Sequence, residues 1–134
     1  MPHQIIEYSD NLDSSIDIDE LVKALHQTAS EVEAFPLAGL RTRAVSRAHY
    51  RIADGDSDNG FVHVVLRIAH GRPLDVRKAA GEKIFQTLCD FLEPHQSAAP
   101  LAISFEMQNI DPDVRWKKNN LRDYIAEREK KSRH

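Results

Sequence analysis

The sequence has a single cysteine, Cys89, and no long hydrophobic run, and each shortage excludes a class of protein. One cysteine cannot form an internal disulfide, and its place in an apolar helical pattern predicts a buried, unreactive thiol. The apolar runs are only a few residues long, which excludes a transmembrane helix. The first thirty residues lack a charged region followed by an apolar one, the pattern of a secretory signal. We therefore expect a cytoplasmic protein with no membrane partner.

The sequence also lacks an excess of positive charge. Lysine and arginine total 18 against 21 aspartate and glutamate residues, which gives a net charge of −3 at pH 7. Nucleic-acid-binding domains normally carry a basic surface, so no nucleic-acid partner is expected. The histidines do not have metal-ligand spacing on one helix, so no metal site is expected. At 134 residues and 41% hydrophobic, the chain can form one domain with a modest core.

Hydrophobic periodicity and turn residues predict two strand–helix–strand units within a single domain, residues 1–134. The first unit covers residues 1–52 and the second covers residues 61–110. The segment between them is rich in Asp and Gly, which predicts turns. Residues 111–134 form a C-terminal extension. Strands are expected at about residues 2–8, 40–52, 61–69 and 100–110, and helices at about residues 17–33 and 73–93.

Local signals predict where several of these elements begin and end. Asp17 followed by Glu20 is a capping box, which marks the start of the first helix. Pro94 is expected to end the second helix. Apolar spacing from Leu121 predicts a short amphipathic helix in the extension. The charged tail from Arg128 onward is expected to be disordered.

The order of elements predicts an α+β architecture. Each strand–helix–strand unit should be parallel with a right-handed crossover, and the two units should form one four-stranded mixed sheet. Two helices can cover only one face of that sheet. Because the other face mixes charged residues with apolar ones such as Val45 and Val65, we expect it to be buried against copies of the same chain.

The amino terminus offers an unusual base. If Met1 is removed, the nitrogen of Pro2 becomes a secondary amine, with a reference pKa of about 8 for an α-amino group. A partly apolar pocket and nearby guanidinium groups lower the pKa of an amine, which would leave it neutral near pH 7. A group that cycles between free base and cation near pH 7 can remove a proton at one atom and return it at another.

Arginines of the second predicted strand are suited to bind acidic groups. Arg41, Arg43 and Arg47 share odd numbers, so an unbroken strand places them on one face. A guanidinium group binds a carboxylate through two parallel hydrogen bonds and stays charged at any physiological pH. The same parity also fits a solvated outer face, and Pro2 also fits a residue that merely follows the initiator methionine.

Several segments, in order and at this spacing, are similar to a known family. They are Met1-Pro2-His3, Glu7-Tyr8-Ser9-Asp10-Asn11, the run from Phe35 to Arg43, Gly71-Arg72-Pro73-Leu74, Ser104-Phe105-Glu106 and Lys117-Lys118-Asn119-Asn120. Together they resemble the 5-carboxymethyl-2-hydroxymuconate isomerase family of the tautomerase superfamily, over nearly the whole chain. The ferredoxin-like sandwich has the same order of elements as the tautomerase fold, and these segments favour the second.

The resemblance implies a homotrimer that acts in bacterial breakdown of the aromatic compound homoprotocatechuate. It implies isomerisation of a 2-hydroxy dienoate with several carboxylates to its 2-oxo-enoate, without a cofactor. Pro2 then matches the amino-terminal base, and Arg41 and Arg72 match the arginines that hold and polarise the substrate. Further candidates for substrate binding are Arg43, Lys117 and Asn119.

Two other functions fit the same residues. One is a non-catalytic ferredoxin-like or tautomerase-like oligomer that binds an anionic metabolite. The other is a tautomerase acting on a different acidic enol, since Arg41 and Arg72 would suit many dicarboxylates.

Overall fold

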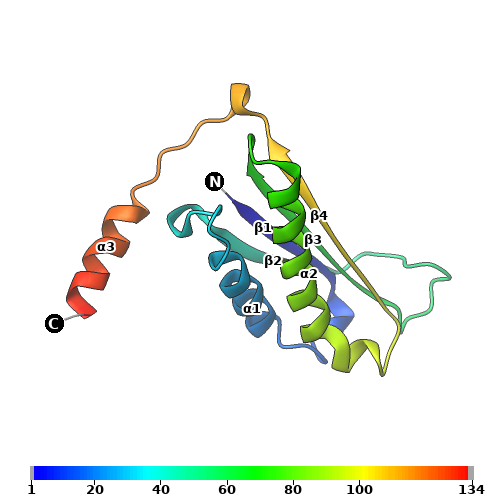
Figure 1. The fold of residues 1–134 in the computed structure, drawn as a ribbon. Helices are drawn as coiled ribbons and strands as arrows, with labels where there is room; N and C mark the ends of the chain where they lie inside the picture. Colours follow the sequence, from blue (N-terminus) through cyan, green and yellow to red (C-terminus); the bar gives the residue numbers. More distant parts are fainter. Residues whose placement is uncertain (1, 133–134) are drawn as a thin grey trace.

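A computed structural model of the protein describes residues 2–132. Within these residues, four strands form one sheet, and two long helices lie side by side on one of its faces (Figure 1). The strands are β1 (His3–Ser9), β2 (Arg41–Arg47), β3 (Gly60–Ala69) and β4 (Leu101–Ile110). The helices are α1 (Ile18–Ser30), α2 (Leu74–Gln96) and α3 (Leu121–Ser132), and short 3-10 turns form η1 (Asp10–Leu12), η2 (Leu37–Gly39) and η3 (Pro112–Val114).

The order of the strands separates the two folds that fitted the sequence. The sheet runs β2-β1-β3-β4, with β1 parallel to β2, β3 parallel to β4, and β1 antiparallel to β3. Each long helix therefore joins two strands that are direct neighbours, whereas the ferredoxin-like fold splits its βαβ units with an intervening strand. The predicted mixed sheet with two helices on one face is confirmed.

The first helix begins as its sequence predicts. The Asp17 side chain accepts a hydrogen bond of 3.2 Å from the backbone N–H of Glu20, which satisfies one free donor of the first turn. Leu21, Leu25 and Ala29 then place one apolar stripe against the sheet, and all three are fully buried. The helix ends at Ser30, slightly before the expected end.

The core lies between this helical layer and the sheet. Alternation along β3 buries every second side chain, while α2 contributes one face at intervals of four residues. The fully buried core residues of these two elements are Val62, Val64, Leu66, Ile68, Ile84, Leu88 and Leu92. On β4, Ile103 and Phe105 pack against the core and Ser104 and Glu106 are exposed, which confirms the predicted alternation.

Two element ends differ from expectation. Strand β2 ends at Arg47 rather than near residue 52, because its partner β1 ends at Ser9, which pairs with Arg47. The second helix continues through Pro94 to Gln96, so the prediction that Pro94 ends it is wrong. Proline removes the backbone donor to the carbonyl group of Asp90, four residues earlier, and because Asp90 is exposed, water can satisfy that carbonyl group.

Helix α2 also carries the cysteine. Cys89 is half-buried rather than buried, and burial, Asp90 and Glu93 all raise the pKa of its thiol. A raised pKa keeps the sulfur protonated and a weak nucleophile. Among residues 2–132, no helix is both long enough and apolar enough to cross a lipid bilayer.

The C-terminal extension stands away from the sheet-and-helix body (Figure 1). The short helix expected near Leu121 is present, but α3 runs on to Ser132, so the prediction of a disordered tail is wrong for residues 128–132. This segment consists largely of strong helix formers, and Glu127 and Lys131 stand four residues apart with opposite charges. Residues 133–134 lie outside the described residues.

Candidate active site

Pro2 lies at the start of the sheet, next to the second strand. It is buried, and its carbonyl oxygen accepts a hydrogen bond of 3.1 Å from the backbone N–H of Arg41. The pairing of β1 with β2 continues from there, with His3 opposite Arg41. The strand register thus brings two of the predicted site residues, Pro2 and Arg41, into direct backbone contact.

His3 lies among arginines at this end of the sheet. The Nη2 atom of Arg41 is 2.9 Å from His3 Nε2, and the Nη1 atom of Arg43 is 3.3 Å from His3 Nδ1. Burial first, and then the positive charges of Arg41, Arg43 and Arg67, lower the pKa of this imidazole. The surroundings therefore favour the neutral ring, and the same cations would disfavour protonation of any amine beside them.

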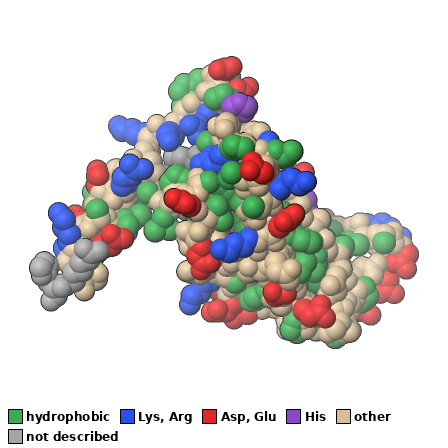
Figure 2. Space-filling view, in the orientation of Figure 1, with side chains coloured by type: hydrophobic (Ala, Val, Ile, Leu, Met, Phe, Trp, Pro, Cys, Tyr) green, Lys and Arg blue, Asp and Glu red, His purple; other side chains and the backbone are tan. Residues whose placement is uncertain are grey.

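A cavity of about 600 Å³ opens beside these groups, between the sheet and the C-terminal segment. We call it the basic cavity, because every charged residue among the described residues that line it is basic. Its lining consists of His3, Arg41, Arg67, Ile110, Val114, Arg115, Trp116, Lys117, Lys118, Asn119 and Leu121. Figure 2 shows Lys and Arg side chains gathered along the segment that leads to α3.

Arg72 occupies a different position, on the other side of the C-terminal segment. Its Nε and Nη2 atoms donate hydrogen bonds to the carbonyl oxygen of Ala34, and its Nη1 atom donates one of 3.1 Å to that of Ala69. The guanidinium carbon lies 5.6 Å from the ring centroid of Phe35, a cation–π contact. Arg72 thereby joins the segment after α1 to the end of β3.

Arg72 also lines a second cavity of about 600 Å³, together with Ala38, Gly39 and Arg122. Arg115, Lys117 and Asn119 line both this cavity and the basic cavity. Asn119 donates a hydrogen bond of 2.9 Å to the carbonyl oxygen of Ala38, which attaches the C-terminal segment to η2. The two cavities are therefore neighbours that share one wall.

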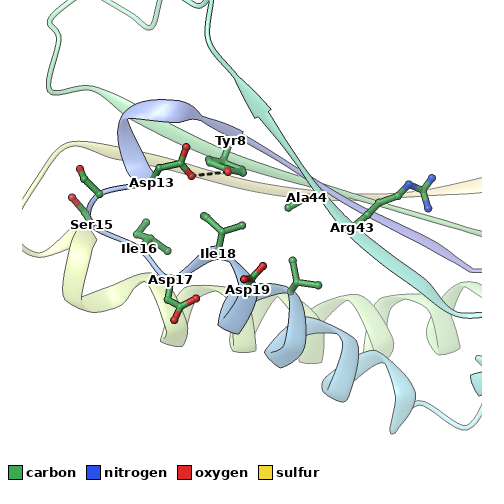
Figure 3. A pocket seen from close by; sticks show the side chains of 11 residues that line it. Tyr8, Asp13, Ser15, Ile16, Asp17, Ile18, Asp19, Arg43 and Ala44 are labelled. Carbon is green, nitrogen blue, oxygen red and sulfur yellow. Dashed lines mark hydrogen bonds between the residues drawn. The ribbon is translucent and has the colours of Figure 1, made fainter.

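Arg43, like Arg72, is a predicted site residue that does not line the basic cavity. Although it contacts His3, it lines a larger cavity of about 860 Å³ at the start of α1 (Figure 3). There the Tyr8 hydroxyl donates a hydrogen bond of 2.7 Å to Asp13, and Figure 3 shows the Arg43 guanidinium pointing away from Asp17. Since this lining includes several aspartates, the cavity is poorly suited to an acidic substrate.

The structure brings together more basic residues than the sequence indicated. Arg41 and Lys117 share the basic cavity with His3, Arg67 and Arg115, which were not among the predicted site residues. One available signal was position: His3 follows Pro2 directly. Within residues 2–132, no three His, Cys, Asp or Glu side chains gather in a way that could hold a metal ion.

Comparison with known proteins identifies the family. The sequence model of the family described as 5-carboxymethyl-2-hydroxymuconate isomerase matches residues 2–125. A relative named 5-carboxymethyl-2-hydroxymuconate Delta-isomerase, from Escherichia coli, is 36% identical over 121 residues, which are 90% of this chain and 96% of the relative. A crystal structure of a 5-carboxymethyl-2-hydroxymuconate isomerase from Deinococcus radiodurans R1 is 32% identical, with a TM-score of 0.86 over 92% of this chain and 93% of that one.

More distant structures share the fold alone. A structure described as a fused 4-OT wild-type symmetric trimer is 15% identical, with a TM-score of 0.63 over 88% of this chain and 93% of that one. The family model covers nearly the whole chain, and the two relatives above are more than 30% identical over most of their length. The chain therefore belongs to the 5-carboxymethyl-2-hydroxymuconate isomerase family, within the tautomerase superfamily.

Proposed function

We propose that the protein isomerises 5-carboxymethyl-2-hydroxymuconate from its dienol form to the 2-oxo-enoate, without a cofactor. One observation in the structure supports this most directly: Pro2 is buried at the start of β1 and bonded through its backbone to Arg41, beside a cavity whose charged residues are basic. We also propose, from the family, that the reaction serves homoprotocatechuate breakdown in the cytoplasm.

The chemistry requires one proton to leave and one to return. The proton leaves the 2-hydroxyl group, the double bonds shift along the conjugated chain, and a proton is added to the carbon at the far end of the diene. The neutral amine of processed Pro2 can accept the first proton and, as the ammonium ion, deliver the second, so the catalyst ends unchanged. Nearby guanidinium charges favour the neutral starting form.

The basic residues supply the other half of the mechanism. Arg41 can hold a substrate carboxylate, with Lys117 and Asn119 of the shared wall as further contacts. Arg72 can stabilise the negative charge that grows on the 2-oxygen, because three of its five N–H groups bond to backbone carbonyls and hold the guanidinium in place. Arg43 does not line the basic cavity, so its proposed effect on the substrate is indirect, through its contact with His3.

The absorbance of the conjugated dienol tests the reaction directly. Protein whose Met1 has been removed, as verified by intact mass, is expected to accelerate the loss of the dienol signal well above the uncatalysed rate. Other acidic enols are assayed in parallel, to determine whether a different substrate of this class is preferred. Binding of the dienol without any acceleration would favour the non-catalytic alternative and refute the proposed function.

We further propose that the protein is a homotrimer assembled through the open face of the sheet. No described helix or strand covers the middle of this face, where Ile5, Val45 and Val65 are half-buried and line one hollow. Val65→Asp is expected to dissociate the assembly, because an unpaired carboxylate would be buried in the interface. Sedimentation velocity measures the change.

Val76→Asp provides the matched control for assembly. Val76 is on the exposed side of α2, away from the open face, so the same substitution there should leave the sedimentation coefficient unchanged. A wild-type protein that sediments as a stable monomer at working concentration would contradict the trimer.

A further inference from the structure

The basic cavity contains more cationic donors than the described residues can pair. Arg41, Arg67, Arg115, Lys117 and Lys118 all line it, and none of its described lining residues is an Asp or Glu. Like charges held this close repel one another unless counter-charge is present. The cavity is therefore arranged for an anion.

Arg115 gives this excess a specific location. Its Nη1 atom is buried and has no hydrogen-bond acceptor among the described residues. Leaving a buried charged donor without an acceptor is unfavourable, so an arriving carboxylate oxygen would be bound with a net gain. Because Arg115 lines both the basic cavity and the Arg72 cavity, the bound group would lie close to the proposed reaction site.

His3 shows the same shortage of acceptors. Guanidinium nitrogens of Arg41 and Arg43 approach its two ring nitrogens, at 2.9 and 3.3 Å. Guanidinium groups only donate hydrogen bonds, and a neutral imidazole has a single acceptor nitrogen. One of the two contacts therefore brings two N–H donors together. A carboxylate oxygen that approaches this pair from one side could accept a hydrogen bond from each.

The apolar part of the lining indicates what kind of anion fits. Ile110, Val114, Trp116 and Leu121 surround the basic groups, and Trp116 is 86% exposed in the single chain. Apolar walls gain nothing from an inorganic ion but favour a carbon chain. The lining thus suits an organic polycarboxylate better than phosphate or sulfate.

We propose that the basic cavity is a subsite for a substrate carboxylate that takes no part in proton transfer, and that His3, Arg67 and Arg115 make the enzyme specific for polycarboxylates over monocarboxylate enols. The inference rests on the proposed function, which it extends by assigning residues that select the substrate. Arg41 then has a place in both the reaction and the selection.

Binding of a compound that cannot isomerise tests the subsite apart from catalysis. Propane-1,2,3-tricarboxylate and butyrate are titrated calorimetrically into the whole protein and its variants. Arg115→Gln and Arg67→Gln are each expected to weaken tricarboxylate binding about 10- to 100-fold, as for loss of a charged hydrogen-bonding group, and to leave the weak binding of butyrate unchanged. Arg128→Gln is the control, since it removes the same charge from α3 but lines neither cavity.

Kinetics provide a second readout. With a polycarboxylate dienol, the Arg67 and Arg115 variants should raise KM and leave kcat near the wild-type value, because Pro2 is untouched. Arg115→Lys should restore only part of the affinity, since lysine keeps the charge without the two-pronged geometry. If Arg115→Gln does not fold, as judged by circular dichroism, Arg67→Gln decides the matter.

Each remaining outcome is decisive. Equal weakening by Arg128→Gln would mean that general charge alone attracts the ligand, and would overturn the subsite. Variants that change the sedimentation coefficient but not the tricarboxylate affinity would show that the cavity holds an acidic side chain of a second copy, which also overturns it. An active wild type whose variants bind normally refutes the subsite alone, whereas a wild type that binds but never isomerises refutes only the proposed function.

Discussion

Protein that retains Met1 is expected to turn over the dienol about 10²- to 10⁴-fold more slowly than processed protein, the usual effect of losing a positioned base. In the unprocessed chain the nitrogen of Pro2 is part of a peptide bond and has no basic lone pair. The fold should be unaffected, because β1 and its hydrogen bonds begin at His3 and the Pro2 carbonyl. Intact-mass analysis of each sample, combined with the dienol absorbance assay, measures the effect.

Pro2→Ala separates the contribution of the proline ring from that of the terminal amine. Pro2→Ala still has a terminal amine after processing, but that amine is primary and free to rotate, whereas the proline ring fixes it. Most activity should therefore be lost in this variant as well. Pro100→Ala, at the opposite end of the sheet beside the Gly60–Leu101 pair, is the matched control and should be fully active. Wild-type turnover by protein that retains Met1 would remove Pro2 from the mechanism.

The features of the fold that could be predicted from the sequence were those that depend on residues a few positions apart. The Asp17–Glu20 cap needs only a spacing of three, and the alternation on β4 needs only a period of two. The parity of Arg41 and Arg43 likewise identified the face they share, since both are exposed on the side away from the helices. Such signals survive folding because tertiary contacts do not alter them.

What the sequence could not reveal depends on how distant segments meet. Arg67 and Arg115 are 48 positions apart in the sequence. They line one cavity only because the C-terminal segment returns past the end of the sheet. The contact of His3 with Arg41 depends on the register of β1 and β2. Alternation fixes only which face each residue takes, not which residues pair across the intervening helix. Neither the shared cavity of Arg67 and Arg115 nor the contact of His3 with Arg41 could be predicted from the single sequence.

Arg72 shows how a residue predicted to bind the substrate can also have a structural role. The resemblance pointed to it as a substrate ligand, yet in the structure its guanidinium bonds to the carbonyl oxygens of Ala34 and Ala69 and stacks on Phe35. These contacts account for three of five N–H groups, so two remain that can face the second cavity. The residue is therefore expected to support both the fold and the reaction.

Arg72→Gln is accordingly expected to lower kcat about 10²- to 10³-fold, the effect of removing one donor to a developing oxyanion. It should also lower the free energy of unfolding by about 1–3 kcal/mol, because the carbonyls of Ala34 and Ala69 lose their partner. Stopped assays of dienol loss measure the first change, and urea unfolding followed by circular dichroism measures the second.

Two further variants divide the two roles. Arg77→Gln removes a neighbouring half-buried guanidinium that donates to the Arg72 carbonyl oxygen and lines neither cavity, so it should reduce stability slightly and leave kcat unchanged. Arg72→Lys keeps the charge but cannot bridge both carbonyl oxygens, so kcat should recover further than stability does. If Arg72→Gln lost stability while keeping wild-type kcat, the guanidinium would be a structural clamp alone, and another cation of the shared wall, Arg115 or Lys117, would have to stabilise the oxyanion.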